Sequence, residues 1–135
     1  MQKTLIAVAV AAGLAALVGC TADNSDLRTL SVADAALLHS KEAALMVDAN
    51  GASTRDKYGI IPGALLLTGY EYDVAELPSE KGSSLVFYCA SSMCSAAPSA
   101  ARKAVEAGYT DVHVLPQGIQ GWIEAGNDVA RPAVG

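Results

Sequence analysis

The sequence predicts a single domain of α/β fold, in which a mostly parallel sheet is covered by helices on both faces. Short apolar runs alternate along the chain with segments of helical character, and strands buried on both faces are typical of parallel sheets. Gly, Asn, Asp and Pro cluster between these segments and indicate turns. The 116 residues that follow position 19 are enough for one globular core and too few for two.

The first predicted helix spans 32–40, because Ser31 is a favourable N-cap and Asp34 places a carboxylate in the first turn. The apolar run 44–47 predicts a buried strand, and the residues Asp-Ala-Asn-Gly that follow it predict a turn. A single helical turn is predicted at 53–58.

The second half of the chain continues the alternation. The apolar run 64–67 predicts another strand, and 69–77 predicts a loop with a short helix. The run 85–88, Leu-Val-Phe-Tyr, has the strongest strand character. It leads to a helix at 95–107, in which Pro98 falls in the first turn, where proline is tolerated. The last strand and the last helix are predicted at 112–115 and 118–125.

The amino terminus has the pattern of a bacterial signal peptide. Lys3 precedes an apolar run, 5–18, which is too short to cross a bilayer as a helix. The run ends in Leu-Val-Gly-Cys, which resembles the lipobox of bacterial lipoproteins with Cys20 as the lipid-bearing residue. The alternative is an ordinary secretory signal that contains a cysteine by chance. The resemblance implies that Cys20 carries acyl chains such as palmitate.

These features divide the chain into a signal peptide at 1–19, a lipid-anchored tether at 20–26 and a globular domain at 27–135. The expected location is the bacterial cell envelope, with the membrane contacted through the lipid. In a Gram-negative organism the expected site is the periplasmic face of the outer membrane, because Thr21 rather than Asp follows the lipidated cysteine.

The mature chain is acidic. From Cys20 onward it has eight basic and fourteen acidic side chains, which give a formal net charge of −6. The sequence contains no basic cluster, and this argues against nucleic acid as a partner. The negative charge should also slow the approach of an anionic substrate, unless the site has a local positive potential.

Cys89 is the main candidate for a reactive group. It follows the predicted strand 85–88 and opens a loop of small or flexible residues before the next helix. Open α/β sheets bind ligands at the carboxyl ends of their strands. Loop N–H groups and a helix N-terminus there would stabilise a thiolate or persulfide anion. The alternative is a buried structural cysteine. The loop residues are Ala90, Ser91, Ser92, Met93, Cys94 and Ser95.

Four short stretches between residues 30 and 129 form a further pattern that covers nearly the whole mature chain. They are 47–48 (Val-Asp), 58–64 (Tyr-Gly-Ile-Ile-Pro-Gly-Ala), 86–89 (Val-Phe-Tyr-Cys), and 106–122, from Glu-Ala-Gly-Tyr through Gly-Ile to Trp. In order and spacing they resemble the rhodanese-like (sulfurtransferase) family. The resemblance implies a single rhodanese-like domain with a five-stranded, mostly parallel sheet.

The same resemblance implies a chemistry. Cys89 occupies the position of the cysteine that carries a transferred sulfur in that family. Its thiolate would attack a sulfane-sulfur donor such as thiosulfate, and the resulting persulfide would pass its outer sulfur to a thiol acceptor in a ping-pong cycle. The implied partners are therefore a small sulfur-containing donor and a thiol acceptor. No cofactor is implied.

Two positions depart from the family in a way that removes positive charge. Cys94 stands where active members usually have an arginine, and Asn50 stands where they often have another. Arg55 is a possible substitute, although charges on a helix more often form a solvated face. A phosphatase of the related cysteine–arginine type needs an arginine at the position of Ser95, so that activity is set aside.

Cys94 also suggests a second chemistry. If the loop curls around Cys89 as in the family, the two Cα atoms would fall within the ~7 Å that a disulfide allows. Cys94 would then be a resolving partner for an oxidised or persulfidated Cys89. The competing interpretation is that Cys94 only fills the place of the arginine.

Two further residues, Asp48 and Met93, each allow two interpretations. Asp48, at a strand end, either binds backbone N–H groups of the next turn or faces the loop, and we favour the structural role. Met93 either shapes the mouth of the pocket or is an exposed loop residue. A metal site is not predicted, because Cys89 and Cys94 lack the paired spacing of zinc ligands.

Three functions remain open from the sequence. The first is an envelope-anchored sulfurtransferase or persulfide carrier that uses Cys89. The second is a redox module in which Cys89 and Cys94 cycle between dithiol and disulfide. The third is a catalytically silent rhodanese-like domain that binds a protein partner, which the sequence does not identify. A cysteine at the attacking position favours the first two.

Overall fold

A computed structural model describes residues 27–132 of the chain. The predicted signal peptide, the tether and Cys20 lie outside the described residues. One five-stranded sheet forms the centre, with strand order β1-β5-β4-β2-β3, and every neighbouring pair of strands is parallel. The strands are β1 (Arg28–Thr29), β2 (Leu45–Asp48), β3 (Leu65–Leu66), β4 (Ser84–Tyr88) and β5 (Asp111–Leu115).

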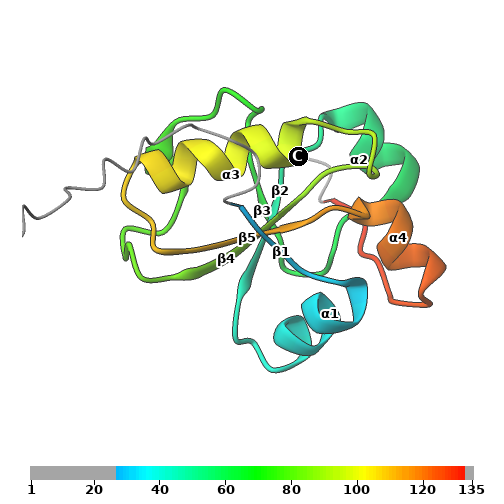
Figure 1. The fold of residues 1–135 in the computed structure, drawn as a ribbon. Helices are drawn as coiled ribbons and strands as arrows, with labels where there is room; N and C mark the ends of the chain where they lie inside the picture. Colours follow the sequence, from blue (N-terminus) through cyan, green and yellow to red (C-terminus); the bar gives the residue numbers. More distant parts are fainter. Residues whose placement is uncertain (1–26, 133–135) are drawn as a thin grey trace, which may run out of the picture.

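The helices lie on both faces of this sheet, and the predicted α/β fold is confirmed. In Figure 1, α3 lies over one face, and α1 lies against the other face with α4 beside it. The first helix has the predicted bounds, and the Ser31 hydroxyl accepts a hydrogen bond from the N–H of Asp34, 3.1 Å away. The helical elements are α1 (Val32–Ser40), α2 (Ala52–Tyr58), η2 (Val74–Glu76), α3 (Ala96–Glu106) and α4 (Gly118–Glu124).

The alternation of side chains along the strands divides the core into two halves. Val47 and Phe87 face the half that contains the buried alanines of α3. Met46 and Val86 point to the opposite half, which contains Trp122 of α4. Because α3 buries mainly alanine against the sheet, its backbone approaches the strands closely.

The register of the strands brings three carboxyl ends to one edge of the sheet. Asp48 at the end of β2 pairs with Tyr88 at the end of β4, and Tyr88 pairs with Leu115 at the end of β5. Cys89 follows Tyr88 directly, so it leaves the sheet at its central strand. Within residues 27–132, no helix has the length and apolar character needed to cross a bilayer.

Candidate functional site

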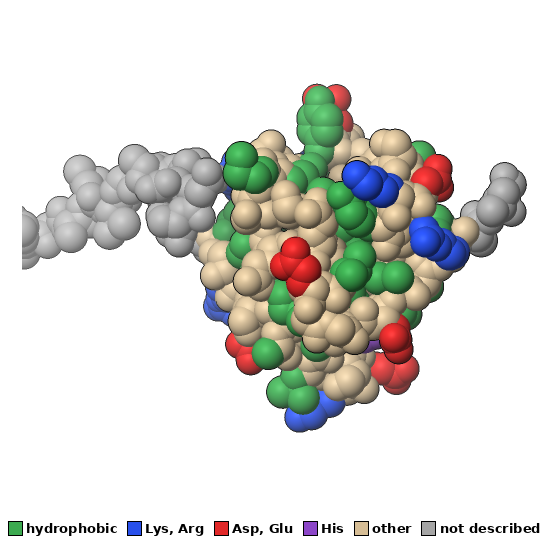
Figure 2. Space-filling model, turned by 90° about the vertical axis from the view of Figure 1, so that its right-hand side faces the viewer, with side chains coloured by type: hydrophobic (Ala, Val, Ile, Leu, Met, Phe, Trp, Pro, Cys, Tyr) green, Lys and Arg blue, Asp and Glu red, His purple; other side chains and the backbone are tan. Residues whose placement is uncertain are grey.

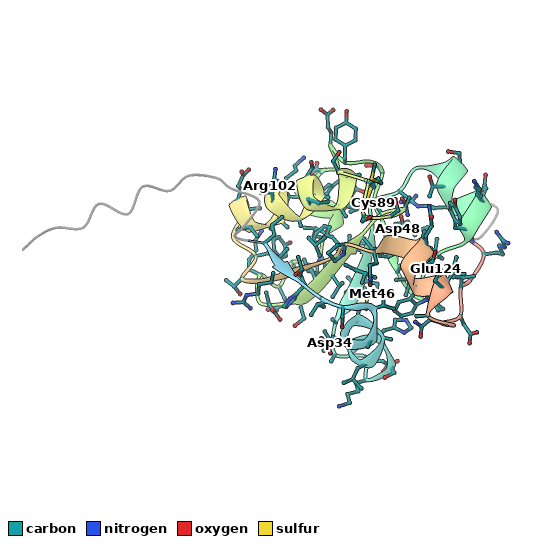
Figure 3. The ribbon with its side chains drawn as sticks, turned by 45° about the vertical axis from the view of Figure 1, so that its right-hand side comes forward. Asp34, Met46, Asp48, Cys89, Arg102 and Glu124 are labelled. Atoms are coloured by element: carbon teal, nitrogen blue, oxygen red, sulfur yellow. A yellow bond between two sulfur atoms is a disulfide. The ribbon has the colours of Figure 1, made fainter. Side chains whose placement is uncertain are left out.

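Cys89 is buried at the carboxyl edge of the central strand. The residue is 2% exposed, and the N–H of Ala49, just after the neighbouring strand, donates to the carbonyl of Tyr88 at 2.9 Å. Figure 3 shows Cys89 beside Asp48 at this edge, well away from Arg102 on α3. The structure therefore places the cysteine where the strand–loop–helix pattern predicts it.

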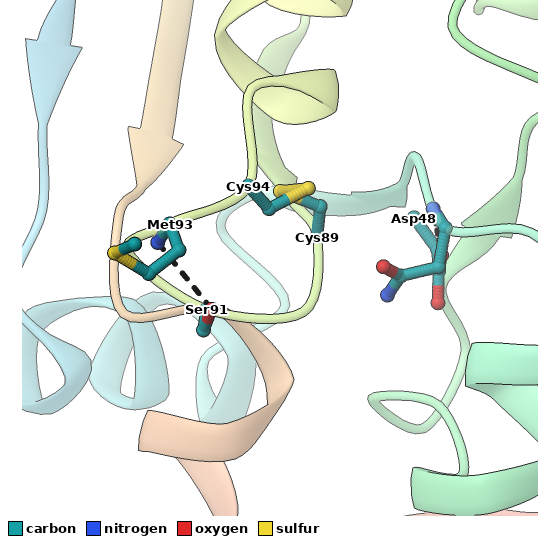
Figure 4. Close-up of a disulfide and its surroundings, with 6 residues drawn as sticks. Asp48, Cys89, Ser91, Met93 and Cys94 are labelled. Carbon is teal, nitrogen blue, oxygen red and sulfur yellow. Dashed lines mark hydrogen bonds between the residues drawn. A yellow bond between two sulfur atoms is a disulfide. The ribbon is translucent and has the colours of Figure 1, made fainter.

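Cys94 forms a disulfide with Cys89 across the loop (Figure 4). The two Cα atoms are 6.3 Å apart, within the ~7 Å that a disulfide allows. Cys94 is only partly buried, in contrast to Cys89. The expectation that the loop brings the two sulfurs within bonding reach is confirmed. Their catalytic roles stay a prediction.

The rest of the loop is held by its own serine and projects a methionine into solvent. Ser91 accepts two hydrogen bonds, one at its carbonyl from the N–H of Cys94 at 3.1 Å and one at its hydroxyl oxygen from the N–H of Met93 at 3.3 Å. Ser92 and Ser95 are exposed, and Ala90 is partly buried. Met93 is 92% exposed, so it is an exposed loop residue, which is the second of its two interpretations.

The first turn of α4 fixes the start of the loop. The N–H of Ile119 donates to the carbonyl of Cys89 at 2.8 Å, and the N–H of Gln120 donates to the carbonyl of Ala90 at 3.1 Å. Gly118 makes this approach possible. Its φ is +61°, and a Cβ atom there would lie 2.5 Å from the carbonyl oxygen of Cys89.

We expect Gly118→Ala to destabilise the domain by about 2–5 kcal/mol. A positive φ costs an L-residue about 1–2 kcal/mol, and the overlap with loop backbone adds about 1–3 kcal/mol. Gly126→Ala is the matched control, because Gly126 also has a positive φ but a Cβ atom added there would meet nothing within 4 Å. Thermal unfolding of both variants measures the difference. Equal losses of stability in the two variants would show that the overlap with the Cys89 loop adds nothing to the cost of the substitution.

A buried hydrogen-bond network supports the strand that carries Cys89. Asp48 is fully buried, and its Oδ2 accepts from the Tyr88 hydroxyl at 2.7 Å. That hydroxyl in turn accepts from the N–H of Ile61 at 3.0 Å. Burial and the negative charge of Asp48 raise the pKa of Tyr88, so the phenol stays protonated and donates. The network joins β2, β4 and the turn before β3.

Asp48 has the structural role that we favoured. Its Oδ1 accepts from the N–H of Asn50 at 2.7 Å and from Nε of Arg55 at 3.2 Å. Nη2 of Arg55 also donates to the carbonyl oxygens of Asp48, at 3.1 Å, and Leu67, at 2.9 Å. Arg55 is therefore committed to β2 and β3, so the structure gives it no role as a free cation beside the loop. The amide nitrogen of the buried Asn50 has no partner among the described residues.

Two hollows flank the Cys89–Cys94 loop. One is a cavity of about 210 Å³ that both cysteines line. The other, of about 500 Å³, is polar and is lined by Ser91, Ser92 and Gln120 among others, but by neither cysteine. A third and larger hollow of about 730 Å³ lies at the opposite end of the sheet, where β2 and β4 begin.

The surface has mixed charge. On the face shown in Figure 2, basic and acidic side chains both occur at separate places, and neither sign forms a large patch. None of the residues that line the 210 Å³ cavity is charged. Within residues 27–132, no group of three or more His, Cys, Asp or Glu side chains is arranged to hold a metal ion.

Comparison with protein families gives one match. The model of the rhodanese-like domain family matches residues 31–125. This range includes both cysteines, the Asp48 network and α4. A search among curated proteins finds no match.

Solved structures share the fold. A protein of unknown function from Rhodopseudomonas palustris, described as a possible tyrosine phosphatase, is 26% identical, with a TM-score of 0.66 over 79% of this chain and 87% of that one. A rhodanese-related protein from Thermoplasma volcanium is 23% identical, with a TM-score of 0.58 over 78% of this chain and 99% of that one.

A third solved structure is that of an enzyme. A 3-mercaptopyruvate sulfotransferase from Escherichia coli, described as having the rhodanese fold, is 20% identical, with a TM-score of 0.61 over 80% of this chain. The match covers 52% of that enzyme, so this chain spans about half its length.

Proposed function

Because the chain belongs to the rhodanese-like domain family, we propose that it carries out sulfur chemistry at Cys89 and that Cys94 completes this chemistry as a redox partner. The observation that carries the proposal is the Cys89–Cys94 disulfide, which closes the loop at the end of the central strand. A silent binding domain would need neither sulfur.

The proposed cycle starts from the dithiol. The Cys89 thiolate attacks the outer sulfur of a sulfane donor, and the bond from that sulfur to the donor breaks, which leaves a persulfide on Cys89. The Cys94 thiol then attacks Sγ of Cys89, the outer sulfur leaves as hydrosulfide with the proton of Cys94, and the disulfide forms. An external dithiol or two thiols supply the two electrons that restore the starting state.

Intact-mass measurement of the purified mature protein tests the cycle. Isolated without reductant, the protein should lack two hydrogens relative to the dithiol. After reduction and one turnover with a sulfane donor, the wild type should return to the disulfide and release one hydrosulfide, whereas Cys94→Ser should hold one added sulfur. If mild oxidation removes the two thiols independently, the pairing proposal fails.

Sulfur transfer without the disulfide is the second candidate function. Family membership favours it, and so do the loop N–H groups of Ala90, Ser91 and Ser92, which have no acceptor among the described residues. Such N–H groups can stabilise a persulfide anion. The phosphatase activity suggested for the Rhodopseudomonas palustris protein is not proposed, because Ser95 occupies the position that needs an arginine.

Thiosulfate should be a poor donor in either case. Its two negative charges would meet an uncharged cavity beside the disulfide. The charge-assisted hydrogen bonds of a missing arginine are worth about 1.5–3 kcal/mol each. We therefore expect Cys94→Arg to raise the kcat/KM for thiosulfate about tenfold or more. Cys94→Leu is the uncharged control, and an equal rise in both variants would contradict the charge argument.

We further propose that the mature protein begins at Cys20 and is anchored to the membrane of the bacterial cell envelope by lipid. The support is the apolar run that ends in Leu-Val-Gly-Cys. Several acyl chains on one terminus hold a protein stably, whereas one chain gives marginal binding. Mass spectrometry of the native amino terminus, with Cys20→Ser as the control, tests this. An unmodified terminus or a cleavage that removes Cys20 would overturn it.

A further inference from the structure

The 210 Å³ cavity lies between the Cys89–Cys94 loop, the start of α3 and the carboxyl ends of β1 and β5. Its wall is almost entirely apolar, with Thr29 and Ser92 as the polar contributors. Both sulfur-bearing residues belong to this wall, so a group that enters the cavity meets the disulfide. The lining residues are Leu27, Thr29, Cys89, Ser92, Cys94, Ala97, Pro98, Val114, Leu115 and Pro116.

The two sulfur-bearing residues differ in accessibility. Cys89 is 2% exposed, whereas Cys94 is partly exposed and follows the exposed Met93. An incoming thiolate must reach the sulfur that it attacks. We infer that the cavity binds the organic group of an uncharged, apolar thiol, which opens the disulfide by attack at Cys94. This inference rests on the proposed redox function, and it names the reductant's chemistry.

The size and the charge of the cavity restrict the ligand. At about 210 Å³ the cavity is smaller than the roughly 300–1,000 Å³ of pockets that hold drug-sized ligands, so the space suits a small apolar group rather than a large coenzyme. A charged group in this wall would lose hydration without gaining a partner. A cysteine next to an apolar side chain on a partner protein has the required chemistry, and so does a small alkanethiol.

The exchange step conserves atoms and electrons. The thiolate of the ligand forms a bond to Sγ of Cys94, and the bond between the two protein sulfurs breaks. The electron pair leaves on Cys89, which becomes a thiolate at the start of its loop. A second thiol then attacks the mixed disulfide at the ligand's sulfur, which leaves Cys94 reduced and the two ligand molecules joined as a disulfide.

The polar hollow beside Ser91 and Ser92 is a weaker candidate for the site that binds the incoming thiol. It is larger, at about 500 Å³, but neither Cys89 nor Cys94 lines it, and Glu124 contributes a negative charge to its wall. A thiolate held there would face that charge and would have no cysteine within the wall to attack. The apolar cavity is therefore the side from which the disulfide is opened.

Mapping the two halves of the opened disulfide tests the site of attack. The oxidised full mature protein is mixed with 1-butanethiol, quenched early with N-ethylmaleimide, and digested for mass spectrometry. We expect butanethiol on Cys94 and the maleimide on Cys89. The reverse pattern would overturn the inference while leaving the proposed redox function intact. A protein with no reducible disulfide would instead remove the proposed function itself.

A series of thiols tests the cavity. The rates of disulfide opening by 1-butanethiol and by 2-mercaptoethanesulfonate are each divided by the rate of the same thiol with 2-hydroxyethyl disulfide, which removes differences in intrinsic nucleophilicity. We expect the normalised rate to be about tenfold or more higher for butanethiol, because the sulfonate cannot be desolvated in this wall. Equal normalised rates would overturn the inference.

Variants at the rim of the cavity separate shape from charge. Thr29 is exposed at the edge strand β1, so a substitution there spares the core. Thr29→Trp should narrow the opening and slow butanethiol several-fold, whereas Thr110→Trp, at an exposed residue outside the lining, serves as the control. Thr29→Lys should raise the rate of disulfide opening by 2-mercaptoethanesulfonate relative to Thr29→Gln. If Thr29→Trp and Thr110→Trp react alike, the thiol does not enter through this cavity.

Discussion

Replacing Cys89 by serine is expected to abolish both sulfur transfer and disulfide formation, with a loss of about 10³-fold or more in the rate of sulfur uptake. A serine hydroxyl at this position would stay protonated at neutral pH, and it cannot hold a persulfide. Within the described part of the chain, the neighbouring sulfur is that of Cys94, which is partly exposed in the loop, whereas Cys89 is the buried cysteine directly at the end of the central strand.

Cys94→Ser is the matched control for this loss. Both variants lack the same disulfide, so any shared loss of stability cancels in the comparison. Cys94→Ser should still take up one sulfur from the donor but should not release hydrosulfide. Sulfur uptake by Cys89→Ser at the wild-type rate, measured by intact mass, would show that the reactive thiol lies elsewhere.

Strands that are buried on both faces could be predicted because their apolar runs are uninterrupted. The runs at 44–47 and 85–88 each fall within one residue of an observed strand. β1 was not predicted, because Arg28 and Thr29 are exposed at the sheet edge and form no apolar run. Its place in the sheet is set by its pairing with β5, which depends on distant residues.

The part of the candidate site that lies within one strand–loop–helix unit could be predicted from the sequence. Cys89 and Cys94 share a loop, so their proximity follows from local sequence. The bond from Tyr88 to Asp48 and the approach of Gly118 to the loop join segments that are 40 and 29 residues apart. Neither contact has a local pattern. A glycine at the first position of the last helix was the one local signal for Gly118, and it did not show which backbone the glycine approaches.

The Asp48 network should make the largest single contribution to the stability of the site. Asp48 has no exposed surface, and its carboxylate satisfies Tyr88, Asn50 and Arg55 at once. Removing one partner of a buried ion pair leaves the other without compensation, which costs about 3–5 kcal/mol. The side chain of Arg55 is 14% exposed, so water compensates part of this loss, and we expect about 3 kcal/mol for Asp48→Ala.

Denaturant unfolding of three variants separates the contributions. Asp48→Asn keeps the shape of the side chain and most of its hydrogen bonds, so its loss of unfolding free energy should measure the contribution of the negative charge. Tyr88→Phe leaves a carboxylate oxygen and the N–H of Ile61 without their partner, for about 1–3 kcal/mol. Arg28→Ala is the control, because the pair of Arg28 with Asp111 spans 3.6 Å at the surface and should be worth less than about 1 kcal/mol.

Because Asp48 and Tyr88 are paired directly before Cys89, loss of the hydrogen bond between them should also affect the reaction at Cys89. Asp48→Ala should lower the rate of sulfur uptake even at temperatures where the variant remains folded, since the end of β4 loses its lateral support. Arg28→Ala should leave that rate unchanged. Wild-type uptake by a folded Asp48→Ala protein would mean that the network stabilises the sheet without positioning Cys89, whereas a stability loss no larger than that of Arg28→Ala would contradict the assignment of the network itself.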